Sequence, residues 1–122
     1  MGGPSATADD LLARLAVVPL VLEARGLDVT PEMIARLERV GDMPSAEILR
    51  RIYRDEIGHV AIGLRWFKHL CRARGLDPEA VFHERVRRCF KGHLKPPFNH
   101  EARTAAGLPT RYYEPLAGSA PG

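Results

Sequence analysis

A carboxylate and an imidazole stand three residues apart in the segment Asp55-Glu56-Ile57-Gly58-His59, within a long helical pattern. Positions i and i+3 of a helix lie on one face, so Glu56 and His59 are able to bind the same metal ion. The second carboxylate oxygen stays free to bridge to another ion. Apolar residues recur at steps of three and four here, and the pair falls within that series: Leu49, Ile52, Glu56, His59, Gly63, Trp66 and Leu70. We therefore expect both side chains to face a bundle interior, where polar groups need a partner.

The alternative for Glu56 and His59 is a structural ion pair, because the Glu-x-x-His spacing also arises by chance on solvated faces. The opposite face of the same helix is strongly basic. It carries Arg50, Arg51, Arg54, Arg65, Lys68 and Arg72. Since such a face cannot supply a core, the pattern favours an inward-facing metal role for the pair.

Two further acidic residues are candidates for the same site. Glu23 lies on the most apolar face of the first predicted helix, where a lone carboxylate needs a cation, so we predict it as the third ligand. A salt bridge to Arg14 or Arg25 is the alternative. Asp55 lies off the apolar series and is a candidate acceptor that orients a ligating imidazole, with a solvated surface position as its alternative.

Helical periodicity and capping residues predict the elements that carry these side chains. Residues 1–6, rich in Gly and Pro, form a flexible tail, and residues 7–95 form one helical domain. Within it we expect helices over residues 8–26, 30–40, 45–74 and 78 to about 95, the first distorted at Pro19. The sequence Ala-Arg-Gly-Leu-Asp occurs at both 24–28 and 73–77, and we expect it to close a helix each time. Residues 96–122 are expected to be an irregular extension rich in Pro and Gly.

Composition restricts the class of protein. The chain has 122 residues, of which 45% are hydrophobic and 27% charged, and no apolar run is long enough to span a membrane. With no secretory signal and only Cys71 and Cys89, we expect a cytoplasmic protein with reduced thiols. The net charge is +3, and a basic cluster within residues 85–95 lacks an aromatic platform. A solvated helix face is therefore favoured over nucleic-acid binding.

Four segments resemble an uncharacterised family of ferritin-like proteins, the domain of unknown function four-five-five. They are Leu22-Glu23-Ala24-Arg25-Gly26-Leu27-Asp28, Asp55-Glu56-Ile57-Gly58-His59-Val60, Trp66-Phe67 and Lys95-Pro96-Pro97-Phe98-Asn99. The resemblance runs from about Thr7 to Gly107. It implies an all-α, ferritin-like helical bundle with a dinuclear iron or manganese site. In that site Glu23 is the single-carboxylate ligand, Glu56 and His59 form the second Glu-x-x-His pair, and Asp55 supports a ligand histidine from outside.

Members of the family normally carry an earlier half with another Glu and another Glu-x-x-His, whereas only Met1 to Ala6 precede the resemblance here. The expected unit is thus the C-terminal half, a half-bundle of one short helix and two or three longer ones. One way to complete the site is a homodimer, in which two copies supply six ligands around a metal pair. The other is a missing N-terminal half encoded elsewhere, which leaves apolar stripes exposed.

The function we expect is di-metal binding, with oxygen-dependent oxidation as the chemistry of a completed site. The alternative is a non-catalytic module whose apolar faces dock on a helical partner. Glu23, Glu56 and His59 would then be buried polar groups that make the choice of partner specific. Neither the residues nor the resemblance names a substrate.

Overall fold

The computed structural model describes residues 4–90 and 92–118, and within these ranges the predicted all-helical fold is confirmed. The helices are α1 (Pro4–Val17), the π-helix η1 (Val18–Glu23), α2 (Ala24–Arg39), α3 (Met43–Ala73), α4 (Pro78–Cys89), α5 (His100–Ala105), α6 (Thr110–Tyr113) and the 3₁₀-helix η2 (Glu114–Leu116). No described residue belongs to a β-strand, although one isolated bridge joins Leu94 to Ala117.

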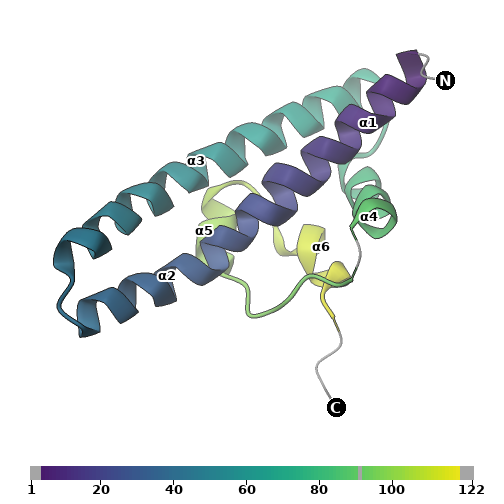
Figure 1. Ribbon diagram of the computed structural model, residues 1–122. Helices are drawn as coiled ribbons and strands as arrows, with labels where there is room; N and C mark the ends of the chain where they lie inside the picture. Colours follow the sequence, from purple (N-terminus) through teal and green to yellow (C-terminus); the bar gives the residue numbers. More distant parts are fainter. Residues whose placement is uncertain (1–3, 91, 119–122) are drawn as a thin grey trace.

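Two long antiparallel rods form the frame of the molecule (Figure 1). The first rod, here called the arm, is α1, η1 and α2 in unbroken succession, and the second is α3. The turn between them uses Gly41 at φ 81°, a conformation that favours glycine. Asp42 then caps α3, because its side chain accepts a hydrogen bond from the Ser45 N–H at 3.2 Å. The predicted long helix over residues 45–74 is thus confirmed.

The predicted break between Gly26 and Thr30 is wrong, because α2 runs through both Gly26 and Pro31. Pro31 has no N–H, so the Leu27 carbonyl one turn earlier loses its usual helical donor. The Asn99 side-chain amide donates to that carbonyl at 3.0 Å. A residue from a distant segment therefore satisfies the carbonyl that a proline inside a helix leaves free.

Residues 78–90 and 92–118, here called the cap, pack against one side of the two rods (Figure 1). The predicted start of α4 is confirmed, since the Asp77 side chain accepts from the Ala80 N–H at 3.0 Å. The predicted irregular structure beyond residue 96 is wrong, because α5, α6 and η2 lie there, and α6 and η2 contribute buried Tyr113 and Leu116. Of the predicted flexible tail, residues 4–6 belong to α1 and residues 1–3 lie outside the described ranges.

The core lies between the cap and the two rods, and this decides which face of α3 is buried. The α3 residues that belong to the hydrophobic core are Val60, Leu64, Phe67 and Cys71. The predicted series is in part uncovered: Ile52 is 51% exposed and Trp66 57% exposed. Because the cap covers only one side of the rods, the second apolar face of α3 has no partner within the described chain. Among the described residues, no helix is both long and apolar enough to cross a bilayer.

Candidate metal centre

The three predicted ligands converge, although they come from segments far apart in the sequence. One donor atom from each of Glu23, Glu56 and His59 lies within 4.8 Å of the other two. Glu23 is the last residue of η1, and the other two lie near the middle of α3. The arrangement thus joins the two rods through a cluster of two carboxylates and one imidazole.

A close contact between Pro19 and Gly63 sets the spacing of the rods at this level. A Cβ built on Gly63 lies only 2.5 Å from the Pro19 Cβ and 2.7 Å from its Cγ, so no larger residue fits without movement. Because the rods are antiparallel, Glu23, four residues after Pro19, comes level with His59, four residues before Gly63. The predicted distortion at Pro19 is confirmed, since η1 has π-helical geometry there.

Burial makes Glu56 the critical group of the cluster. Its side chain is 22% exposed, whereas that of His59 is 59% exposed. Glu56 Oε1 is fully buried and has no hydrogen-bond partner in the described part of the chain. Burial raises the pKa of Glu56, and the neighbouring Glu23 carboxylate raises that pKa further, while His59 opposes the shift. Within the described residues, one buried oxygen of the Glu56 carboxylate is therefore left without a hydrogen bond, and only the exposed His59 imidazole opposes its charge.

A metal cation fits this donor set. Two oxygen donors and one imidazole nitrogen suit iron or manganese, and the buried Glu56 Oε1 is free to accept a metal bond. Ligand bonds of about 2.0–2.2 Å place two donors on one ion at most about 4.4 Å apart. The donor atoms of Glu23, Glu56 and His59 lie within 4.8 Å of one another, and this upper bound slightly exceeds the limit of about 4.4 Å. A small side-chain rotation, or a carboxylate shared between two ions, accommodates the difference.

The neighbours of the cluster bear on the alternatives left open by the sequence. Arg25, one alternative partner for Glu23, donates instead to the Lys95 carbonyl at 2.6 Å and lies 3.6 Å from Asp28. His59 Nδ1 lies 3.8 Å from Glu56 Oε2, which is a weak ion pair at an exposed imidazole. Asp55 is exposed, and no hydrogen bond joins it to His59 in the described ranges, so its supporting role stays a prediction.

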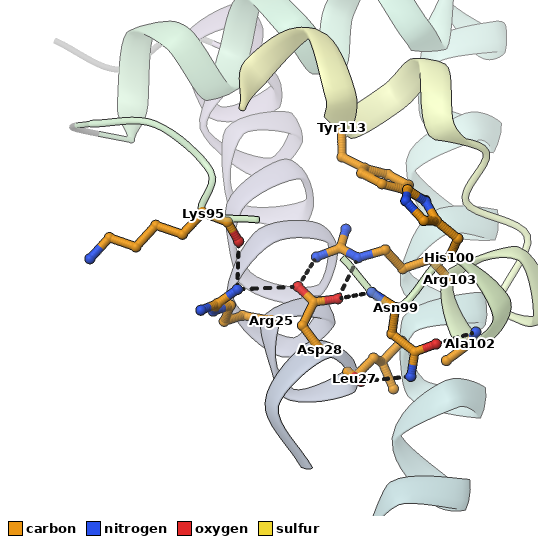
Figure 2. A network of polar contacts seen from close by, with 9 residues as sticks. All are labelled: Arg25, Leu27, Asp28, Lys95, Asn99, His100, Ala102, Arg103 and Tyr113. Carbon is orange, nitrogen blue, oxygen red and sulfur yellow. Dashed lines mark hydrogen bonds and ion pairs between the residues drawn. The ribbon is translucent and has the colours of Figure 1, made fainter. Parts of the chain in front are cut away.

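Sequence reasoning missed a buried polar network on the cap side of the arm (Figure 2). Asp28 accepts from Arg103 Nε at 2.9 Å and Nη2 at 2.7 Å, and from the Asn99 backbone N–H at 2.8 Å. The Arg103 guanidinium lies 4.9 Å from the centre of the Phe98 ring and 4.4 Å from that of the Tyr113 ring. Asp28 and Asn99 belong to the two segments that are most specific to the family resemblance. That specificity was the feature of the sequence that could have pointed to these two residues. No pattern pointed to Arg103.

Fold and cluster together define an all-helical protein with a candidate carboxylate–histidine metal centre. The chain belongs to the family described as "Protein of unknown function (DUF455)", whose sequence profile matches residues 4–114. It is 44% identical over 107 residues to an uncharacterized protein of Haemophilus influenzae, across 84% of this chain and 36% of the relative. The chain thus spans about a third of that relative's length. No solved structure matches it.

Proposed function

We propose that the protein binds iron or manganese through Glu23, Glu56 and His59 as one half of a ferritin-like dinuclear centre. The observation that carries the proposal is the buried, unpartnered Glu56 Oε1 within a cluster of three donors. A buried carboxylate of this kind is costly unless a cation compensates it. The ferritin-like assignment rests further on the sequence resemblance.

The second half of the centre requires ligands from another surface, because three donors do not fill the coordination of two ions. The rods offer a face on which such a surface docks. Exposed Ile52, exposed His59 and exposed Trp66 follow one another on α3 at seven-residue steps, so they share one face. On the arm, the exposed apolar residues recur at steps of seven and four. They are Leu11, Val18, Leu22, Val29 and Met33.

We assign this face to a second copy of the chain. A twofold-related copy presents the same apolar residues and brings a second Glu23, Glu56 and His59, which doubles the donor set to the number that a dinuclear bundle centre uses. Large exposed apolar faces mark interaction sites rather than free surface. A monomer instead keeps His59 in solvent, where its imidazole holds a metal weakly.

The chain's own residues would perform three tasks in the assembled centre. Glu23 and Glu56 supply negative charge that matches the bound cations, and His59 supplies a neutral nitrogen ligand. The Pro19–Gly63 contact fixes the separation of the carboxylates. The apolar residues around His59 would exclude water once they are covered. Bound iron or manganese would supply redox chemistry with oxygen, which makes an oxidoreductase the class of enzyme we propose.

The test measures metal content and mass together. Protein loaded with Fe(II) or Mn(II) without oxygen should carry about one ion per chain. The particle mass should be twice the chain mass of 13.5 kDa. Glu23→Gln, Glu56→Gln and His59→Ala should each lose most of the metal. His69→Ala is the matched control, because His69 is an exposed histidine on the same helix outside the cluster. Equal metal loss in the control, or none in the three variants, contradicts the proposal.

A second comparison tests the dimer separately. Ile52→Asp places a charge on the proposed contact face and should yield a monomer with less metal. Leu76→Asp introduces the same charge at an exposed apolar residue between α3 and α4 and should leave the dimer intact. A wild-type monomer with full metal content would refute the second copy. A metal-free wild type that binds a helical partner would instead favour the non-catalytic module.

A further inference from the structure

A cavity lies between η1–α2 and the cap, and none of the three candidate metal ligands lines it. It encloses about 190 Å³. Its apolar walls come from Val21, Leu22, Phe90, Leu94 and Phe98, and its polar walls from Arg25, Asp28, His93, Lys95 and Arg103. An apolar cavity with a few convergent polar groups is the usual form of a small-molecule site.

Arg103 gives this cavity its polarity. The residue is 2% exposed, yet its Nη1 has no hydrogen-bond partner in the described part of the chain. Nε and Nη2 are both bonded to Asp28, and Figure 2 shows the remaining nitrogen directed away from that carboxylate. A buried guanidinium N–H without an acceptor is costly, and a ligand oxygen is able to satisfy it.

The charges around the cavity favour an anion. Arg25, Lys95 and Arg103 are cationic, and the only carboxylate in the lining is Asp28. Asp28 is already compensated, since it accepts both Arg103 bonds and the Asn99 backbone N–H. The lining therefore retains an excess of positive charge, beside aromatic and aliphatic walls that a fully hydrated inorganic anion does not match.

We propose that this cavity binds a small organic carboxylate, with the carboxylate on Arg103 Nη1 and the apolar body against Phe90, Leu94 and Phe98. Size supports the assignment, because an apolar cavity of about 150 Å³ holds benzene and this one is somewhat larger. The site does not depend on metal at Glu23, Glu56 and His59. A cavity of this volume suits a ligand of the size of benzoate or a short fatty carboxylate.

Benzoate is the probe, and benzyl alcohol is its neutral counterpart of similar shape. Both are titrated into metal-free, full-length protein while backbone amide signals are followed by NMR. Benzoate should bind with a Kd on the order of 1 mM and about tenfold more tightly than benzyl alcohol. The shifted signals should come from the lining residues. Equal affinity of the two probes, no binding by benzoate, or shifts confined to other residues would overturn the proposal.

Two variants locate the carboxylate. Arg103→Lys keeps the charge beside Asp28 but removes Nη1, and should weaken benzoate about tenfold while benzyl alcohol is unaffected. Leu22→Glu adds a negative charge at a lining residue that is 53% exposed, so the fold should tolerate it. It should weaken benzoate about threefold. Leu11→Glu, at a 43% exposed residue outside the lining, is its matched control, because Leu11 and Leu22 both belong to the proposed contact face and a charge there should affect the dimer in both variants.

The pair Leu22→Glu and Leu11→Glu keeps the proposal testable even if Arg103→Lys fails to fold, which circular dichroism will show. A benzoate affinity that is weaker in Leu22→Glu but unchanged in Leu11→Glu supports the cavity site. The same affinity in both variants refutes it.

Discussion

The contact between Pro19 and Gly63 makes Gly63→Ala the sharpest test of the structure. The added Cβ would lie 2.5 Å from the Pro19 Cβ, whereas carbon atoms in good contact are about 3.5–4.0 Å apart. The rods must therefore separate by about 1.0–1.5 Å at this level. Overpacking of this size costs about 1–3 kcal/mol of unfolding free energy.

Gly58→Ala is the matched control for this substitution. Gly58 lies on the same helix, five residues earlier, and its added Cβ meets nothing within 4 Å. Both substitutions gain about 0.5–1 kcal/mol because alanine forms helices better than glycine. That gain cancels in the difference between the two variants, which isolates the steric cost. Gly63→Ala should thus be about 1–3 kcal/mol less stable than Gly58→Ala in urea unfolding.

The same displacement should reach the metal cluster, because Glu23 and His59 each lie four residues from the contact. Separating the rods by about 1 Å moves the donors out of reach of a shared ion, so we expect metal affinity to fall at least about tenfold in Gly63→Ala. Gly58→Ala should bind metal as the wild type does. Equal stability and equal metal affinity of the two variants would refute the close packing at Pro19.

Three further predictions concern single polar groups. In metal-free protein, Glu56→Gln should raise stability at neutral pH by about 1 kcal/mol, because it removes a buried charge beside Glu23. Because the pKa of Glu56 is raised in the folded protein, the contribution of Glu56 to stability is largest at acidic pH and is lost as the pH rises and the carboxyl group ionises. The stability difference between the wild type and Glu56→Gln should therefore shrink as the pH is lowered. Asn99→Ala should cost about 2–3 kcal/mol in thermal unfolding, because it deprives the Leu27 carbonyl of its donor and α5 of its cap, and a loss below about 1 kcal/mol would contradict both roles. Asp28→Asn should cost about 3–5 kcal/mol in urea unfolding by leaving a buried guanidinium uncompensated, and near-neutral stability would show that the network is dispensable.

The repeated sequence Ala-Arg-Gly-Leu-Asp shows where local reasoning succeeds and where it fails. At residues 73–77 it closes α3 as predicted, with Gly75 at φ 68° and Asp77 capping the next helix. Pro78 follows directly and disfavours a helical conformation at Asp77, so the local sequence suffices. At residues 24–28 the same five residues continue the helix. There Asp28 bonds to Arg103 and Asn99 instead of capping, which no local pattern specifies.

The sequence by itself determined the helical class, the long α3 and its end at residues 73–77, the start of α4 and the identity of the three candidate ligands, because helical periodicity and capping depend on residues a few positions apart. Only the tertiary structure decided which face of α3 is buried, since α3 is apolar on two sides and the cap covers one. It also decided that Glu23 meets Glu56 and His59, through the Pro19–Gly63 contact, and that Arg103 lies buried beside a cavity. These are contacts between distant segments, and their energies depend on packing that no short window of sequence contains.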